Sequence, residues 1–310
     1  MAKIRGPHLS TPLTLLGSDR DALLRSDPEI LSPGEDARYL VSRAGAVALH
    51  EDTDGTLHAL LETEDPRGGT LQPLVLLGRR DGYRVLGVEI PEPSAELDAP
   101  GRDLRDLRRV ADRLHDHDAD LAAAAVAMGF WHRSMRHCPL CGATLVAEMG
   151  GWVLRCSEDG TEQFPRTDAA VIMAVRDGQD RLLLARNAHF PSGFYSVLAG
   201  FVEPGESLEN AVAREVAEEV GIAVEEVEYM GSQPWPFPRS LMLGYRAWAP
   251  DATELTLQDE EIAEARWFTR EELAAALEAE EIALPGTASM GRALIDDWYG
   301  RSAEKRAVEK

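Results

Sequence analysis

The stretch from Gly200 to Ile222 constrains the fold of this chain more than any other segment. Ser207 is a residue type that caps helix starts, and Gly221 is the residue type that ends helices in a left-handed conformation. Between them, apolar residues recur every four positions, at Leu208, Val212, Val216 and Val220. This spacing predicts an amphipathic helix that packs one face on a core.

Three carboxylates occur together on the predicted helix, at Glu215, Glu218 and Glu219. Spacings of three and four residues place them on one side of the helix, where like charges repel unless a cation lies among them. Oxygen ligands favour hard ions, so the pattern predicts Mg²⁺ or Mn²⁺, which proteins usually bind together with substrate phosphates. The alternative is a solvated acidic helix face, which is common in a chain with 54 Asp and Glu residues.

The complete 23-residue pattern resembles the signature of the Nudix hydrolases, the Nudix box. Its fixed positions are filled by Gly200, Glu206, Arg214, Glu215, Val216, Glu218, Glu219, Gly221 and Ile222. The resemblance implies a fold of the α/β class, an α/β/α sandwich with a mixed sheet. It also implies hydrolysis of a nucleoside diphosphate linked to another group.

We expect Glu215, Glu218 and Glu219 to bind one or more Mg²⁺ or Mn²⁺ ions. Glu219, or alternatively Glu215, is the expected acceptor of the proton from the attacking water. We expect Arg214 to orient these glutamates through charge-assisted hydrogen bonds without touching the substrate, and Glu206 to support the loop or an outer metal.

A nonapeptide after the box, SQPWPFPRS at 232–240, contains three alternating prolines that exclude a central strand. It matches a motif of the NADH pyrophosphatase (NudC-type) subfamily. The resemblance implies cleavage of NADH or NAD⁺ to NMN(H) and AMP, with 5′-NAD-capped RNA as a further substrate. Aromatic rings suit the stacking of two ring systems. The expected substrate-binding residues are Phe164, Phe201, Ser232, Gln233, Trp235, Phe237 and Ser240. A glutamate before a Trp-Phe pair faces the metal site in this subfamily, and Glu261 is the best match.

A second metal centre is predicted by C-x-x-C at Cys138 and Cys141, followed by a C-x-x-D-G knuckle with Cys156 and Asp159. Two such knuckles are typical of a zinc ribbon, and a carboxylate is an acceptable zinc ligand. The alternative is a ribbon that has lost its metal. His137 is a reserve ligand, but it adjoins Cys138 and would strain the knuckle.

The predicted domain order is a small mostly-β domain at 1–101, linking helices at 102–136, the ribbon at 137–166, the Nudix domain at 167–300 and a flexible tail at 301–310. Asp54-Gly55 and Asp81-Gly82 each predict a hairpin turn in the first domain.

The segment 115–118, His-Asp-His-Asp, contains residue types that bind metals. We interpret it as a solvated polar face, because neighbouring residues of a helix point in different directions.

The net charge of −22 disfavours a protein that tracks duplex nucleic acid or a zinc-ribbon nucleic-acid binder. No long apolar run or signal-peptide pattern is present, so we expect a cytosolic location and no membrane partner. The resemblance implies a homodimer. The other functions left open are a Nudix hydrolase for ADP-ribose or another nucleoside diphosphate derivative, and a non-catalytic nucleotide-binding regulator.

Overall fold

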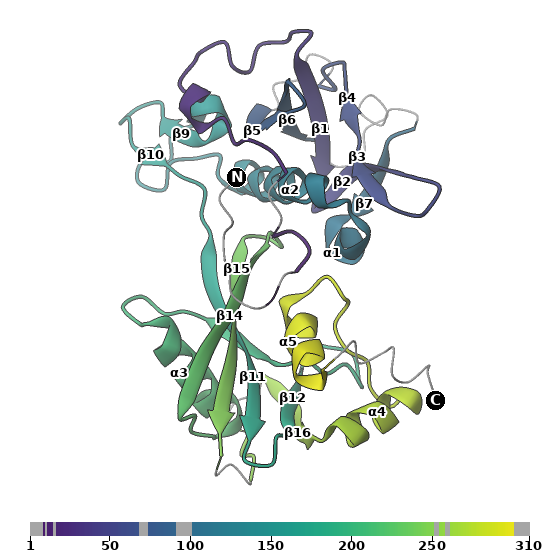
Figure 1. Cartoon of the computed structure of the whole chain (residues 1–310). Helices are drawn as coiled ribbons and strands as arrows, with labels where there is room; N and C mark the ends of the chain where they lie inside the picture. The colour runs from purple at the N-terminus through teal and green to yellow at the C-terminus, as the bar shows by residue number, and fades with distance from the viewer. Residues whose placement is uncertain are drawn as a thin grey trace. The chain divides into compact units, whose positions relative to one another are not determined.

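The computed structural model describes residues 9, 11–14, 17–67, 74–90, 101–250, 254–257 and 261–300 (Figure 1). The predicted tail and the first eight residues lie outside this range. The chain divides into two compact units. One consists mainly of residues 168–233 and the segment that begins at Leu241, and the other of residues 12–167 and 234–240.

The N-terminal unit contains a mixed sheet with strand order β3-β2-β1-β6-β5. Strand β1 pairs in parallel with β6 and antiparallel with β2 and β4, and β7 pairs antiparallel with β2. Both predicted hairpins are present, between β2 and β3 and between β5 and β6. The strands are β1 (Ala37–Arg43), β2 (Ala46–Glu51), β3 (Leu57–Ala59), β4 (Leu61–Glu62), β5 (Leu74–Arg80), β6 (Tyr83–Glu89) and β7 (Asp103–Asp106).

The segment predicted as linking helices differs from the prediction at its start. Residues 103–106 form strand β7, because pairing with β2 outweighs the helical spacing of the leucines there. The helices that follow are α1 (Leu107–Val110) and α2 (Ala119–Ser134). Helix α2 packs on β1 and β6, so it covers the N-terminal sheet.

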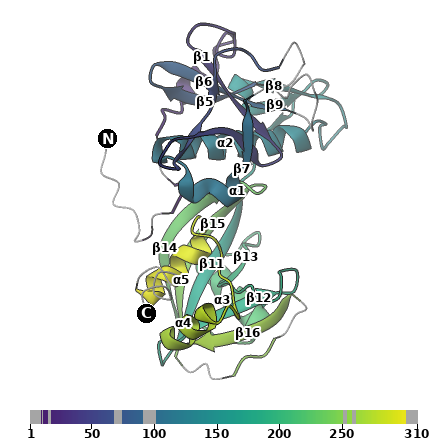
Figure 2. The same ribbon diagram turned by 90° about the vertical axis from the view of Figure 1, so that its right-hand side faces the viewer.

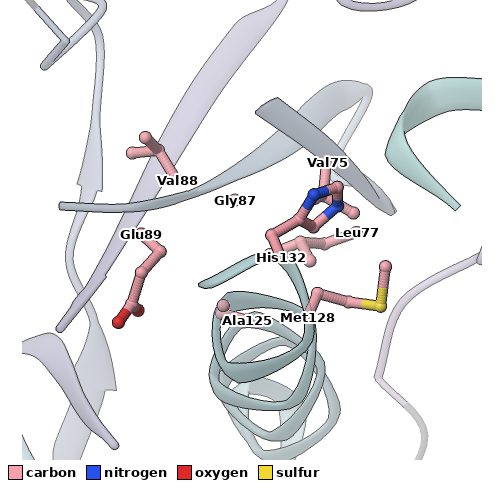
Figure 3. A pocket seen from close by; sticks show the side chains of 9 residues that line it. Val75, Leu77, Gly87, Val88, Glu89, Ala125, Met128 and His132 are labelled. Carbon is pink, nitrogen blue, oxygen red and sulfur yellow. The ribbon is translucent and has the colours of Figure 1, made fainter. Parts of the chain in front are cut away.

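Helix α2 approaches β6 closely at Gly129. A Cβ atom at Gly129 would lie 2.5 Å from Glu89 Oε2, so a larger residue would require the Glu89 side chain to shift. Beside it, a pocket between the helix and strands β5 and β6 is lined mainly by apolar side chains together with His132 (Figure 3). His132 Nε2 lies 2.8 Å from the carbonyl oxygen of Gly151, and burial lowers the pKa of the imidazole. The pocket therefore favours a neutral ring.

The predicted ribbon forms a three-stranded antiparallel sheet of β8 (Leu145–Glu148), β9 (Val153–Cys156) and β10 (Glu162–Gln163). Its two knuckles share one bonding pattern. The Gly142 N–H donates to the Cys138 carbonyl at 2.9 Å, and the Gly160 N–H donates to the Cys156 carbonyl at 3.2 Å. Both glycines have positive φ, of 77° and 71°, which explains why each knuckle ends in glycine.

The C-terminal unit is built on a sheet with order β14-β15-β11-β12-β16, in which β13 also pairs with β11. Strand β14 is an edge strand, so Pro234 near its end does not interrupt a central ladder. The strands are β11 (Asp168–Asp177), β12 (Leu182–Asn187), β13 (Leu198–Phe201), β14 (Glu226–Trp235), β15 (Ser240–Ala249) and β16 (Ile262–Phe268).

Helices cover both faces of this sheet (Figure 2). Alternate residues of β11 enter two separate cores. Ile172 and Ala174 pack in the core of α4 and α5, whereas Val171, Met173 and Val175 pack in the core of α3. The helices are α3 (Leu208–Val220), α4 (Arg270–Glu278) and α5 (Met290–Tyr299). The predicted α/β/α sandwich is confirmed.

Four short 3₁₀ turns complete the described elements: η1 (Ala22–Leu24), η2 (Ala111–Arg113), η3 (Asp116–Asp118) and η4 (Met149–Gly151). In the described part of the chain, none of the helices combines the length and the apolar character that crossing a bilayer requires.

Candidate active site

Helix α3 begins and ends as the sequence predicts. The Ser207 hydroxyl accepts a hydrogen bond from the Asn210 N–H at 3.2 Å, and Gly221 ends the helix with φ of 73°. In the preceding loop, Glu206 Oε2 accepts from the Glu203 N–H at 3.1 Å. The helix is thereby fixed at both ends, which holds its carboxylates in place.

Arg214 is the centre of a hydrogen-bond network with three of the box glutamates. It donates to both carboxylate oxygens of Glu206, at 2.8 and 2.9 Å, in the two-pronged geometry that makes arginine–carboxylate pairs strong. It also donates to Glu215 and Glu218, each at 2.9 Å, and to the Phe201 carbonyl at 2.9 Å. The guanidinium thus fixes the helix against the loop before it and against β13.

The three predicted metal-binding glutamates differ in exposure. Glu219 is 5% exposed, while the side chain of Glu218 is 56% exposed and that of Glu215 is 14% exposed. The backbone of β13 lies directly against Glu215. A Cβ atom at Gly200 would lie only 1.9 Å from Glu215 Cδ, so the glycine makes room for this carboxyl group.

Burial raises the pKa of Glu215, and the negative charges of Glu218 and Glu261 raise it further, against the opposing effect of Arg214. The Arg214 hydrogen bond lowers the pKa of Glu206. A half-desolvated carboxylate beside other carboxylates favours a cation. Carboxylate oxygens are also the donors that hard divalent ions prefer, so these residues fit the cation that a Nudix box implies.

Glu261 lies just before β16, and its carbonyl accepts a hydrogen bond from the Ala188 N–H at 2.6 Å. Its charge acts on Glu215, so the structure brings this predicted residue near the box helix.

In the part of the chain that the structure describes, the ligand atoms of Glu215, Glu218 and Glu219 do not all lie within 4.8 Å of one another. Among the described residues, ligand atoms gather within 4.8 Å of one another in two other groups. These are the ribbon set, Cys138, Cys141, Cys156 and Asp159, and a set in the N-terminal sheet, His58, His115 and Asp118.

The ribbon set has the dimensions of a tetrahedral zinc site. Cys141 Sγ lies 3.4 Å from Cys156 Sγ, and Cys138 Sγ lies 3.8 Å from Asp159 Oδ2. Zinc–ligand bonds of about 2.0–2.3 Å in a tetrahedral site place the ligand atoms roughly 3.3–3.8 Å from one another. The Thr161 N–H donates to Asp159 Oδ1 at 2.8 Å and is the main cause that lowers the pKa of this carboxyl to about 2. Asp159 is therefore available as an anionic ligand.

The nonapeptide residues have different environments. Gln233, predicted to bind substrate, is fully buried. Its amide nitrogen donates to the Ala288 carbonyl at 2.7 Å, and its amide oxygen accepts from the Met290 N–H at 2.8 Å. A buried amide bonded to the start of α5 supports a structural role, and the contact of Gln233 with substrate stays a prediction. Ser232 and Ser240 are half-buried.

Four aromatic residues were predicted to form the substrate pocket. Phe201, on β13 of the C-terminal unit, is 60% exposed. Trp235 and Phe237 form an edge-to-face pair with ring centroids 5.1 Å apart, and Phe164 is exposed. These last three residues belong to the N-terminal unit.

The fold and this site define a Nudix hydrolase. The family model for the NUDIX domain matches residues 165–287. Models for an NADH pyrophosphatase-like rudimentary NUDIX domain and an NADH pyrophosphatase zinc ribbon domain match residues 36–131 and 133–164.

Similarity to curated proteins extends over nearly the whole chain. The chain is 41% identical, over 92% of its length and 94% of theirs, to the NAD-capped RNA hydrolases NudC of Mycobacterium bovis and Mycobacterium tuberculosis. It is 40% identical to that of Stutzerimonas stutzeri, over 73% of this chain and 77% of the relative. The chain therefore belongs to the NudC-type Nudix hydrolases.

Proposed function

We propose that this protein hydrolyses the diphosphate bond of NADH and NAD⁺, giving NMN(H) and AMP, and opens the same bond in 5′-NAD caps of RNA. The observation that supports this most directly is the complete set of box glutamates, three of which bind Arg214, in a chain that aligns with NudC proteins over 92% of its length. A regulator that only bound nucleotides would have no use for the full carboxylate set.

In the proposed reaction, water attacks one phosphorus atom, the bridging P–O bond breaks, and the water loses a proton. Mg²⁺ or Mn²⁺, when bound by Glu215, Glu218 and Glu219, neutralises charge on the diphosphate. Glu219, or alternatively Glu215, accepts the proton. Glu219 is the most buried of the three, and low exposure strengthens its electrostatic interactions.

Arg214 acts on the glutamates and not on the substrate. Its donors are directed to Glu206, Glu215, Glu218 and a backbone carbonyl. We propose that it keeps Glu215 and Glu218 oriented for the cation, while Glu206 fixes the guanidinium. Glu261 adds negative charge near Glu215 and is proposed as a further ligand.

Phe164, Phe201, Trp235 and Phe237 are the proposed stacking surfaces for the dinucleotide, with Ser232 and Ser240 as polar contacts. The ribbon is proposed to hold Zn²⁺ through its three cysteines and Asp159. The homodimer remains a prediction from the family resemblance, and the cytosolic location remains a prediction from the apolar pattern of the sequence.

The proposed function is tested by incubating the purified protein with Mn²⁺ and either NADH, NAD⁺, ADP-ribose or diadenosine diphosphate, and identifying the products by chromatography. We expect AMP and NMNH from NADH at the highest kcat/KM. Intact NADH would refute the proposal, and equal turnover of all four substrates would refute the NADH preference.

Matched variants connect this activity to the site. Glu219→Gln is expected to reduce kcat by about 10²-fold or more, since it removes the proposed proton acceptor. Glu209→Gln changes an exposed glutamate in the first turn of the same helix and serves as the control. A parallel assay with NAD-capped RNA compares its kcat/KM with that of the free dinucleotide and shows which of the two is the better substrate.

A further inference from the structure

A second cluster of metal-binding side chains lies in the N-terminal sheet and has no part in the proposed reaction. His58, on β3, His115, before η3, and Asp118, at the end of η3, bring ligand atoms within 4.8 Å of one another. His115 and Asp118 stand three residues apart on one tight turn, so they lie together. The sequence interpretation of this segment as a solvated polar face is wrong for Asp118, whose side chain is 3% exposed, while His115 is half-buried.

Backbone hydrogen bonds position all three residues. His58 pairs with His50 in the β2–β3 hairpin. The His115 N–H donates to the Leu57 carbonyl at 2.8 Å, which fixes His115 beside β3. The Asp118 N–H donates to the His115 carbonyl at 2.8 Å. The arrangement thus follows from the fold of the domain and does not depend on side-chain rotamers alone.

The two carboxylates that face the ring nitrogens of His58 point to a cation. Its Nε2 lies 3.2 Å from Asp52 Oδ2, and its Nδ1 lies 3.2 Å from Asp118 Oδ2. If Nε2 carries the proton and donates to Asp52, the Nδ1 lone pair faces a carboxylate oxygen. Two acceptors at this distance require a positive charge between them, which is either a proton or a metal ion.

The surroundings favour a metal ion over a proton. A histidine that binds a metal usually has a carboxylate beside its other ring nitrogen, and Asp52 Oδ2 lies 3.2 Å from His58 Nε2. Arg80 forms an ion pair with Asp118 Oδ1, which leaves Oδ2 directed at His58. His115 adds a second imidazole, whose Nδ1 now accepts only a long 3.3 Å bond from the His117 N–H.

We propose that His58, His115 and Asp118 bind a divalent transition-metal ion of the Zn²⁺ type, with water completing the coordination. Two imidazoles and one carboxylate suit zinc-like ions better than Mg²⁺. Bonds of about 2.0–2.2 Å imply tetrahedral edges of roughly 3.3–3.5 Å, and the His58 Nδ1 to Asp118 Oδ2 distance of 3.2 Å is close to that.

Such an ion would cross-link β3 to the turn that precedes α2. The Asp118 side chain is 3% exposed, whereas that of His58 is 22% exposed, so the ion would reach the site from the histidine side. A ligand that binds only the folded domain stabilises it, and this proposal is independent of the proposed catalytic reaction.

The test is the metal content of the full-length protein after equilibration with Zn²⁺ in excess Mg²⁺, measured by mass spectrometry. Relative to the unaltered protein, His58→Gln and His115→Gln are each expected to lose about one equivalent of zinc. His117→Gln changes a neighbouring histidine that stacks on His115 but is not in the ligand set, and it should keep full zinc content.

Two further measurements separate this site from the ribbon and from misfolding. Cys138→Ser should lose the zinc of the ribbon. The double variant Cys138→Ser/His115→Gln should contain about one equivalent of zinc less than Cys138→Ser alone. In the unaltered protein, Zn²⁺ should shift the imidazole NMR signals of His58 and His115 and leave that of buried His132 in place. Equal zinc content in all histidine variants, or unshifted His58 and His115 signals, would overturn the proposal and leave a protonated His58 between Asp52 and Asp118.

Discussion

The backbone of Gly200 lies directly against the carboxyl group of Glu215, with no room for even one carbon atom between them. Gly200 is on β13 and Glu215 is on α3, so this contact joins the strand to the box helix. A side chain at position 200 would have to displace the carboxyl group of Glu215.

Gly200→Ala is expected to displace Glu215 and reduce kcat by about 10²-fold, since a shift of about 1 Å in a catalytic group can cost that much. The measurement is steady-state hydrolysis of NADH with Mn²⁺. Gly286→Ala is the matched control, because a Cβ atom there meets nothing within 4 Å and the backbone has no positive φ. An unchanged kcat for Gly200→Ala would show that Glu215 tolerates displacement.

Asp159→Cys is expected to raise the zinc affinity of the ribbon, and Asp159→Ala to lower it. Loss of a residue that is hydrogen-bonded to a ligand lowers metal affinity by about 10- to 100-fold. Loss of a ligand itself should lower the zinc affinity by more than that. Zinc retention against a competing chelator measures both changes. Glu158→Ala, one residue earlier and outside the ligand group, is the control. If Asp159→Ala holds zinc as firmly as the unaltered protein, the aspartate is not a ligand.

Gln233→Leu is expected to destabilise the C-terminal unit, because the Met290 N–H and the Ala288 carbonyl lose their partner. Each buried polar group left without a partner costs about 1–3 kcal/mol. Thermal unfolding should show a lower midpoint, while KM for NADH stays unchanged. Ser232→Ala, at the half-buried neighbour, should leave the midpoint in place. A raised KM at unchanged stability would instead restore the substrate-binding role.

Asp36 gives a pH-dependent contribution to stability. Arg84 donates to its two oxygens at 2.7 and 2.5 Å, and this hydrogen bonding lowers the pKa of Asp36 in the folded protein. The stabilisation is present above the unfolded pKa of about 3.9 and is lost as the pH falls through the lower folded-state pKa.

Asp36→Asn should therefore lower the unfolding midpoint at pH 7, and the difference from the unaltered protein should vanish in acid. Denaturant unfolding across this range measures it. Glu64→Gln, at an exposed carboxylate of the same unit, is the control. A difference that persists unchanged below the pKa of Asp36 would mean that the pair contributes nothing through its charge.

Sequence patterns located the box helix well because its determinants are local. Ser207, the four-residue apolar spacing and Gly221 are all within one segment, and the structure confirms the helix from Leu208 to Val220. The two ribbon knuckles are local in the same sense. Short-range patterns of this kind depend little on distant parts of the chain.

Features that depend on distant partners were less predictable. Leu104 fits the helical spacing that continues at Leu107, and the pairing of residues 103–106 with β2 makes them a strand. The direction of the Gln233 amide depends on Ala288 and Met290. His58 and Asp118 come together only through the pairing of β3 with the turn that precedes α2. The residues next to Gln233, His58 and Asp118 in the sequence do not indicate these contacts.

The alternation along β11 has a consequence for how this domain tolerates change. Odd-numbered residues of the strand support α3, and even-numbered ones support α4 and α5. Deleting one residue from its middle would exchange the two sets beyond the deletion. Residues that now pack in the core under α3 would face α4 and α5, and the reverse would hold for the other set, so packing would be lost on both faces of the sheet. We therefore expect length changes in this enzyme to be confined to its loops, and β11 to keep its length wherever hydrolysis is retained.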